Sequence, residues 1–491
     1  MMEKAKTLLL VMLVALSLIQ SYFLAYSMPG IGATVKTDQD LYNADPLGKE
    51  SSVENVIFPE EIVLHFGDNE HTVLYPGTTF YNMILKDRIQ GREFKGFQRN
   101  PANVLNWDEV RKNDIGVELR FQNGIPVELL KKLLKVQGDL LFLGEMIDRI
   151  WIFKAKDSEE VRTFFFSSDG QKVYESTQAD LTVRDVQDYV GFGEYQPKYQ
   201  MTSDGIYLPK QPIQSVEMVY PYETYSSEVM QQNLLGDPSA TKALYDRSGS
   251  QIYTDGKRGL QIEQKGMWMI FTNPAASQSE ENLLSENVFS SIEFINQHGG
   301  WDGVHRFINP GMNQDGKTGK YAEFQQYVDN YPVIETKGFE YGNIRLTLQQ
   351  GVVTEYSRSL ITLADRSKVR EARWLPGGAQ LRTALDHYDR RSEVVRLFPA
   401  LKAQPLDNNE LKFIPVWAVQ LEDGTQEALV EAYPAGFVPQ EMKNLSSMGQ
   451  GSNKETNGNN QNGQETASKD GNSLFDDSEP LQHSIAPDSQ E

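Results

Sequence analysis

The most constraining feature of this chain is an uncharged run from Thr7 to Tyr26, close to the amino terminus. An α-helix rises about 1.5 Å per residue, so a run of this length reaches roughly 30 Å, the thickness of a bilayer's hydrocarbon core. Lys4 and Lys6 precede the run and acidic residues follow it, which favours a cytoplasmic amino terminus. Residues 1–27 are therefore predicted to form a cytoplasmic stub and one membrane-spanning anchor, with the remaining chain outside the cytoplasm.

The run has an alternative interpretation as a cleaved signal peptide. Such peptides have a shorter apolar core, of about 7–15 residues, followed by a small-x-small cleavage site. Ala25-Tyr26-Ser27 has that pattern, so cleavage stays open. The length of the run favours an uncleaved anchor.

Three polar residues interrupt the apolar run on one side. Ser17, Gln20 and Ser21 are spaced i, i+3 and i+4, which places them on one face of a helix. Hydrogen bonds between membrane helices contribute about 0.6–2 kcal/mol each. This face is predicted to contact a partner helix in the membrane, the alternative being that Gln20 merely lies at the outer interface.

The composition excludes several classes of chemistry. There is no cysteine, and therefore no disulfide, thiolate nucleophile or thiolate metal site. A net charge of −21 argues against binding to nucleic acid or adsorption on anionic lipid. Hydrophobic residues make up 39% of the chain, enough to form folded domains outside the membrane.

The pattern after the anchor predicts an α+β fold of small helix-plus-antiparallel-sheet units. Short strand-like segments alternate with single helices, and a loop-like stretch at 191–205 separates the first unit from the rest. The final segment is rich in Asn, Gln, Gly and acidic residues, and it is predicted to be disordered. The predicted divisions are an N-terminal domain at 45–190, a middle domain at 205–280, a C-terminal domain at 281–440 and an acidic tail at 441–491.

Several individual elements are predicted within these domains. Thr182 is expected to cap a helix over Val183–Val190, and a longer helix is expected at Leu284–Gln297. We also expect a helix at Ala322–Asp329 and a strand at Phe339–Tyr341.

One segment satisfies the G-x-x-x-x-G-K-[ST] pattern of a phosphate-binding loop, namely Gly311–Thr318. Such a loop needs a strand before it and a helix that starts right after the threonine. Here Pro310 precedes the segment and Gly319 follows it, so the context is wrong. We interpret the segment as a glycine-rich turn.

No other pattern supplies catalytic chemistry. The six histidines have no metal-ligand spacing, and no G-x-S-x-G is present. His65 and His71 are placed to face each other across a hairpin, which we interpret as a chance cross-strand pair. We therefore predict no catalytic residue, no cofactor, no metal site and no enzymatic activity.

Several segments resemble a known family. The opening MEKAKTLLLVMLVALSLIQSYFLAY resembles the amino terminus of the YycH (WalH) family of low-GC Gram-positive bacteria. Further similarity lies in Leu234–Asp237, in Tyr253–Arg258 and in Phe324–Val333. The resemblance covers roughly residues 1–440 and leaves the acidic tail outside. These segments are typical of the family without being chemically diagnostic.

The resemblance implies a regulator of a two-component system. The resemblance to this family implies that the chain has one membrane helix and a three-domain extracytoplasmic body, and that it forms a complex with YycI and the sensor histidine kinase WalK (YycG). The expected function is to modulate that kinase through transmembrane-helix contacts in cell-wall homeostasis, with restraint the favoured direction and the sign left open. The middle and C-terminal domains together are expected to resemble YycI.

Two other functions compete with this one. A cell-wall-binding module would use the anchor as a passive tether, so any unrelated membrane helix would serve. An extracytoplasmic hydrolase is disfavoured, because the sequence offers no nucleophile or metal set.

The anchor makes a testable prediction about topology. Protease added to intact, wall-stripped cells should degrade the body, because the body is expected outside the membrane. Recovery from the medium of a mature protein that starts at Met28 would contradict an uncleaved anchor.

Overall fold

The structure is a computed structural model that describes residues 6, 46–138, 142–156, 158–236, 241–245, 250–274, 283–308, 320–440 and 442–443. The predicted anchor, the Gly311–Thr318 loop and the acidic tail lie outside these residues, apart from Lys6 and residues 442–443. Among the described helices, none combines the length and apolar character that a bilayer span requires. The chain divides into two units, Met1–Glu441 and Met442–Glu491, and the elements named below belong to the first.

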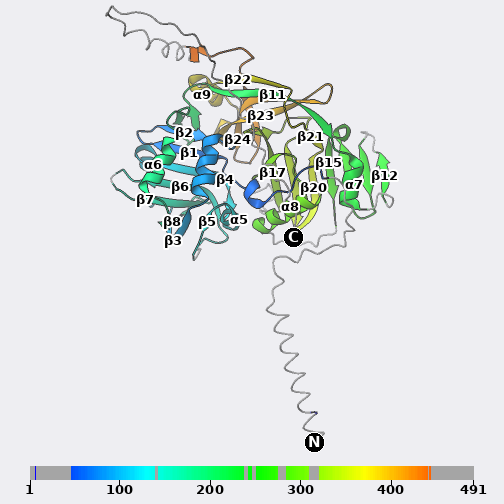
Figure 1. The fold of residues 1–491 in the computed structure, drawn as a ribbon, viewed down its shortest axis with the longest axis horizontal. Helices are drawn as coiled ribbons and strands as arrows, with labels where there is room; N and C mark the ends of the chain where they lie inside the picture. Colours follow the sequence, from blue (N-terminus) through cyan, green and yellow to red (C-terminus); the bar gives the residue numbers. More distant parts are fainter. Residues whose placement is uncertain are drawn as a thin grey trace, which may run out of the picture. The chain divides into compact units, whose positions relative to one another are not determined.

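The amino-terminal half forms a sheet of ten strands that is antiparallel except where β3 meets β5 (Figure 1). From edge to edge the order is β10 (Tyr207–Pro209), β9 (Tyr199–Met201), β2 (His71–Leu74), β1 (Glu61–Phe66), β4 (Ile115–Pro126), β6 (Met146–Lys154), β7 (Val161–Ser167), β8 (Lys172–Ala179), β3 (Glu93–Pro101) and β5 (Lys135–Val136).

Short helices accompany this sheet. The predicted helix after Thr182 is confirmed as α6, which begins with a capping box in which Thr182 and Asp185 satisfy each other's backbone N–H groups. α6 buries Val186, Tyr189 and Val190 toward β4, β1 and β6. The helices of this half are α2 (Val53–Val56), α3 (Thr79–Asn82) with the π-helix η1 (Met83–Ile89), α4 (Trp107–Asn113), α5 (Val127–Leu133) and α6 (Val183–Gly191).

The carboxyl-terminal half forms a second sheet of fifteen strands, of which β18 and β23 pair in parallel. Its main path is β12 (Lys242–Tyr245), β13 (Gln251–Thr254), β14 (Gly259–Glu263), β15 (Trp268–Thr272), β20 (Val352–Ser359), β19 (Asn343–Gln349), β17 (Tyr321–Val328), β18 (Tyr331–Ile334), β23 (Val394–Leu406), β24 (Glu410–Leu421), β11 (Ile213–Thr224) and β21 (Ile361–Leu363). Beside this path, β16 (Val304–Ile308) pairs with β17, β22 (Val369–Leu375) with β11, and β25 (Gln426–Glu431) with β24. The helices are α7 (Ser227–Leu235), α8 (Leu284–Gln297), α9 (Gly378–Asp386) and the 3-10 turns η3 (Gln264–Gly266) and η4 (Arg391–Glu393).

Of the three elements predicted above for this half, one is confirmed and two are wrong. α8 has the predicted bounds, Leu284–Gln297. The predicted helix at Ala322–Asp329 is instead strand β17, because β16 and β19 pair with both of its edges and this pairing overrides local propensity. The predicted strand at Phe339–Tyr341 forms only one isolated bridge, since Gly338 and Gly342 on either side turn the chain with positive φ.

The division of residues 205–440 into two domains stays a prediction. One hydrogen-bonded sheet runs through both proposed domains, because β11 pairs with β21, β22 and β24. The predicted linker at 191–205 contains β9, which pairs with β2 and so belongs to the first sheet.

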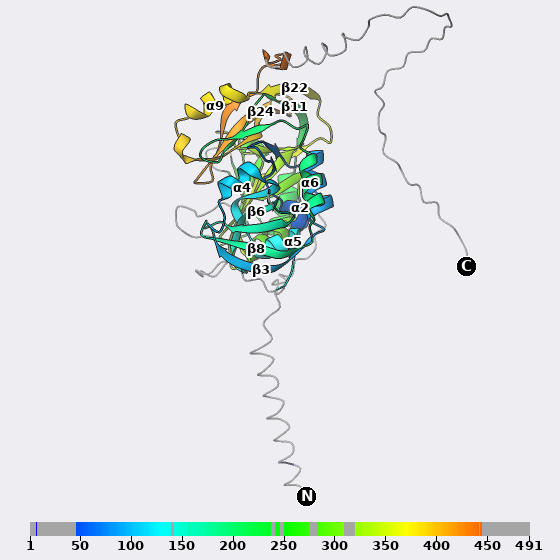
Figure 2. The ribbon, with the colours of Figure 1, turned by 90° about the vertical axis from the view of Figure 1, so that its left-hand side faces the viewer.

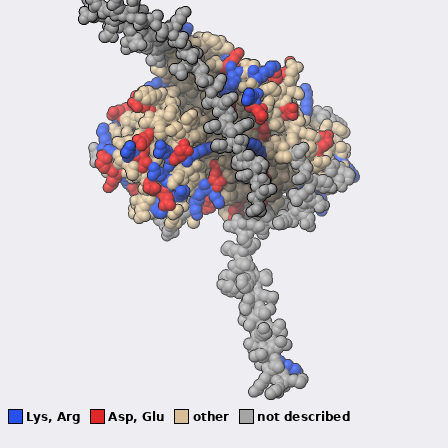
Figure 3. Space-filling view, in the orientation of Figure 1, with Lys and Arg blue, Asp and Glu red and all other residues tan. Residues whose placement is uncertain are grey.

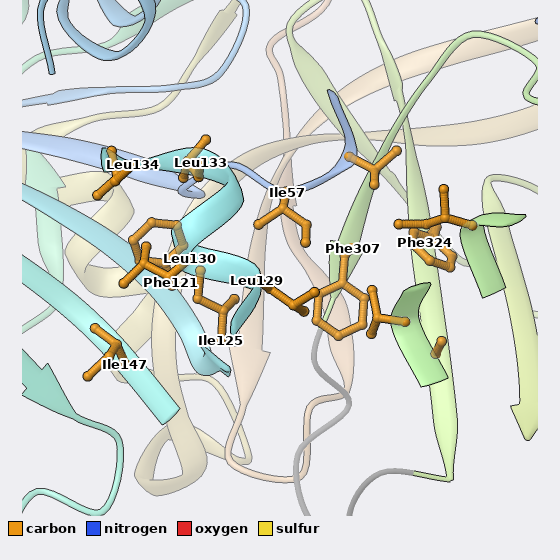
Figure 4. Packing of buried hydrophobic residues seen from close by; sticks show 14 of the residues in the cluster. Ile57, Phe121, Ile125, Leu129, Leu130, Leu133, Leu134, Ile147, Phe307 and Phe324 are labelled. Atoms are coloured by element: carbon orange, nitrogen blue, oxygen red, sulfur yellow. The ribbon is translucent and has the colours of Figure 1, made fainter. Parts of the chain in front are cut away.

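The two halves are joined by a shared apolar core. Helix α2 packs against α5 of the first half, beside which it lies in Figure 2, and against β16 of the second half. Ile57, Leu129 and Phe307 are buried in this junction, and Figure 4 shows them side by side. Apolar burial contributes roughly 25 cal/mol per Å², so these side chains stabilise the contact between the sheets.

The residues that enter the described structure at its amino-terminal end are fixed to α8. Asn296 accepts hydrogen bonds at Oδ1 from Ser51 N (2.9 Å) and Trp301 Nε1 (2.7 Å), and its Nδ2 donates to Ser51 O (2.9 Å). Lys49 and Trp301 form an isolated antiparallel bridge, and a Cβ on Gly48 would lie 1.9 Å from Trp301 O. We call this set of five residues the N-terminal clamp.

The clamp can be tested through Asn296. Asn296→Ala removes three hydrogen bonds, so we expect the free energy of unfolding to fall by about 2 kcal/mol. Gln297→Ala is a matched control, because the Gln297 amide makes a single 3.3 Å bond to exposed Glu293 and its loss should cost under about 0.5 kcal/mol. Denaturant unfolding would measure both, and equal losses would contradict the clamp.

Candidate functional site

A buried chain of polar side chains crosses three neighbouring strands of the first sheet. His65 and His71 are cross-strand partners in the β1–β2 hairpin, with their Nδ1 atoms 3.1 Å apart. His65 Nε2 lies 3.1 Å from Glu118 Oε2 on β4. All three residues are fully buried. The predicted facing of the histidines is confirmed, but a chance pair does not account for their link to Glu118.

Burial and the neighbouring charges determine the protonation states of His65, His71 and Glu118. Burial lowers the pKa of His71 to about 3 and also lowers the pKa of His65, so both rings are neutral. Burial alone would raise the pKa of Glu118, but Arg120, His65 and Arg149 together hold it well below its ordinary value. An ionised Glu118 needs a proton on His65 Nε2, which leaves His65 Nδ1 to accept from the Nδ1–H of His71.

Two arginines complete the surroundings of Glu118. Its Oε1 lies 3.1 Å from Arg120 Nε and 3.5 Å from Arg149 Nη1. The guanidinium of Arg120 lies 4.7 Å from the ring centre of Tyr207, and that of Arg149 lies 4.3 Å from the ring centre of Phe166. Both contacts are within the range of cation–π attraction.

A second group of ion pairs connects the two sheets. Glu60 Oε1 lies 2.7 Å from Arg306 Nη2 on β16, and Glu60 Oε2 accepts from Gln122 N at 2.6 Å. Glu61 lies 3.4 Å from Arg120 Nη1 of the first sheet and 3.3 Å from Arg396 Nε on β23. These five charged residues therefore connect β1 and β4 to the carboxyl-terminal half.

The two groups meet at a cleft of about 380 Å³ that opens between the halves. We call it the charged cleft, because guanidinium and carboxylate groups form most of its polar wall. Its lining residues are Glu60, Glu61, Arg111, Arg120, Phe121, Gln122, Asn123, Asp148, Arg149 and Ser168 from the first sheet and its loops, Met201 and Gly205 from the segment around β9, and Val395 and Arg396 from β23.

Asp148 on β6 has the most unusual environment in the cleft wall. Burial raises its pKa to about 6, although Arg149 beside it acts in the opposite direction. Its Oδ1 atom is buried and has no hydrogen-bond partner within the described residues. Across the same residues, no group of three or more His, Cys, Asp or Glu is arranged to hold a metal ion. The charged groups that line the cleft are suited to bind and orient a charged molecule.

On the face of the molecule drawn in Figure 3, positive and negative side chains are mixed. Figure 3 shows Lys and Arg interspersed with Asp and Glu over the first sheet, without a large area of one sign. Electrostatic attraction of a highly charged polymer would need such an area.

The structure does not test the sequence-predicted site. Ser17, Gln20 and Ser21 lie outside the described residues, so the helix-partner face stays a prediction. The sequence analysis did not identify Glu118 and Arg120 as members of a site. Their signal was two opposite charges spaced i, i+2 in an apolar strand, which places both side chains on one face of the sheet.

The segments that carry the family resemblance have structural roles. Arg258 donates from Nη1 to Leu234 O and from Nη2 to Leu235 O, both at 2.9 Å, and so caps the end of α7. Asp255 holds that guanidinium through a 2.8 Å contact with Nε. Phe324–Val333 contains most of the β17–β18 hairpin, with Asp329 at positive φ in its turn.

These features define a class of sheet-rich α+β protein whose two halves are joined by buried ion pairs. Comparison with known proteins makes the class specific: this chain belongs to the YycH family. The model of the "YycH protein, N-terminal domain" matches residues 3–191, and that of the "YycH protein, C-terminal domain" matches residues 203–430. The first match includes the apolar run, and the gap between the matches lies in the predicted linker.

A relative and a solved structure agree with this membership. The Bacillus subtilis (strain 168) protein named "Two-component system WalR/WalK regulatory protein YycH" is 20% identical over 441 residues, which cover 85% of this chain and 94% of that protein. The crystal structure of YycH from Bacillus subtilis matches with a TM-score of 0.62 at 18% identity, covering 78% of this chain and 98% of that one. The structural likeness confirms the mixed α+β, sheet-rich fold.

The neutral histidines make a prediction about acid stability. Because the pKa of His71 is about 3 in the folded state against 6.5 for the free side chain, the unfolded state takes up more protons below pH 6.5. Acidification from pH 7.5 to 5.0 should therefore destabilise the parent by about 2 kcal/mol more than His71→Asn, which keeps a polar group near Nδ1 but does not titrate.

Unfolding in denaturant at the two pH values would measure this difference. His387→Asn is the control, because His387 is exposed at the end of α9 and this variant should follow the parent. An equal acid sensitivity of His71→Asn and the parent would contradict a buried neutral His71.

Proposed function

We propose that this chain is a membrane-anchored extracytoplasmic regulator that modulates the sensor kinase WalK of the WalR/WalK two-component system. The observation that carries the proposal is its membership of the YycH family together with a relative named as a WalR/WalK regulatory protein. The match to the N-terminal family domain covers residues 3–191, which include the segment proposed as the anchor.

The proposed mechanism is a contact between helices within the membrane. The anchor would lie beside the helices of the kinase, with Ser17, Gln20 and Ser21 facing them, and would bias the kinase between two signalling states. A differential interaction of 1–3 kcal/mol changes such an equilibrium about 5–150-fold. The body would act together with YycI, and restraint of the kinase is the direction that we favour.

The N-terminal clamp supports a role for the outer body in this mechanism. Residues 28–47 separate the proposed anchor from the clamp. Lys49 and Ser51, which follow this segment in the sequence, are bound to Trp301 and Asn296 of the carboxyl-terminal half. A change in the body would therefore be transmitted to the chain that leads to the anchor.

The helix contact predicts a defect for one triple variant. Replacing Ser17, Gln20 and Ser21 by leucine keeps the apolar span but removes the polar face. We expect association with the kinase to weaken by about 1–2 kcal/mol, on the scale of hydrogen bonds between membrane helices. Crosslinking or a membrane two-hybrid assay against the kinase would measure association, alongside a reporter of its regulated genes.

The matched control changes Leu16, Leu18 and Ile19 to other aliphatic residues and should have a smaller effect. If the polar-face variant associates and signals like the parent, while deletion of the outer body abolishes both, the contact is extracytoplasmic. Full function with an unrelated membrane helix would favour the competing cell-wall-binding module with a passive tether.

A further inference from the structure

The wall of the charged cleft has more hydrogen-bond donors than acceptors. Four arginines line it (Arg111, Arg120, Arg149 and Arg396), and each guanidinium carries five N–H donors. Three carboxylates line it as well, and both oxygens of Glu60 are bound by Arg306 and by Gln122 N. Glu118 and Asp108, which do not line the cleft, pair with Arg120, Arg149 and Arg111, so the number of N–H donors is in excess but the number of positive charges is not. The cleft therefore has an unfilled capacity for acceptor atoms.

Part of this donor capacity is buried and unused. Arg111 Nε and Arg149 Nε are inaccessible to solvent and have no hydrogen-bond partner among the described residues. The ion pair of Arg149 with Glu118 is loose, at 3.5 Å, and that of Arg396 with Glu61 is 3.3 Å. Because these Nε atoms are enclosed, an acceptor that enters the cleft would bind the other N–H groups of the same guanidiniums.

The size and the charge of the cleft narrow the class of ligand. A volume of about 380 Å³ lies within the range of sites for small molecules, roughly 300–1,000 Å³. Guanidinium groups match carboxylate and phosphate oxygens in paired hydrogen bonds, and the four of this wall carry more N–H donors than the carboxylates around them occupy. A small organic or inorganic anion satisfies both requirements.

From this geometry we infer that the charged cleft binds a small anion through carboxylate or phosphate oxygens, with Arg149 as its main contact and Arg396 on the facing wall. Arg149 belongs to the first sheet and Arg396 to the second. A bound anion thus adds a connection between the two halves beside the one that Glu61 already makes. This inference does not depend on the kinase proposal.

The probes are sodium phosphate and sodium succinate, titrated calorimetrically at low ionic strength into the full-length chain in detergent micelles. We expect saturable binding of at least one probe. Binding of phosphate alone assigns a phosphate ligand, binding of succinate alone assigns a carboxylate ligand, and binding of both supports the shared class. Failure of both probes to bind saturably would overturn the inference.

Arg149→Gln should weaken the affinity about tenfold, the effect of one charged hydrogen bond. Arg162→Gln is the matched control, because Arg162 lies on the neighbouring strand β7 with 29% side-chain exposure against 28% for Arg149, and it also lies over a phenylalanine ring. Arg162 is outside the cleft, so its variant should bind like the parent. Equal effects of the two variants would contradict the assignment.

Asp148→Asn provides a second variant that keeps the shape of the wall. It removes a negative charge next to Arg149, so the affinity for either anion should rise about threefold. Should Arg149→Gln fail to fold, this variant still decides the question. Unchanged affinity in Asp148→Asn would place the anion away from this wall and reject the site.

Discussion

The buried ion pair between Glu60 and Arg306 is the interaction on which the joining of the two sheets depends. The side chains are only 5% and 3% exposed, and burial of two charges costs several kcal/mol each unless their remaining hydrogen-bonding groups are satisfied. Here Gln122 N donates to Glu60 and Arg306 Nε donates to Phe58 O at 2.7 Å. Removal of either charge would cost about 3–5 kcal/mol, because the remaining charge would be buried without a partner.

The apolar and the charged parts of the junction act differently. The contact of Ile57 and Leu129 with Phe307 is strong but has little directional preference. The polar contacts depend on the orientation of their groups and therefore restrict how the two halves can be placed against each other. They form a continuous series of contacts, in the order His71, His65, Glu118, Arg120, Glu61 and Arg396. A change of charge at one member alters the electrostatic surroundings of the next, in an interior where screening by water is weak.

The sequence predicted correctly those helices whose formation depends on residues close to one another in the chain. The capped helix after Thr182 and the helix Leu284–Gln297 depend on capping and periodicity, and both are present as predicted. The segment Ala322–Asp329 was mistaken for a helix because its strand character comes from partners distant in sequence. The charged cleft escaped prediction for the same reason, since Asp148 and Arg396 are brought together only by the joining of the two sheets.

The N-terminal clamp has a mechanical consequence. Tension that enters along the chain from residue 46 reaches Lys49 and Ser51 before it reaches β1, the first strand of the amino-terminal sheet. The load therefore passes through Asn296 and Trp301 into α8 and the strands that it covers, and the amino-terminal sheet is shielded while these bonds hold. The half that is later in the sequence is thus the first to bear force.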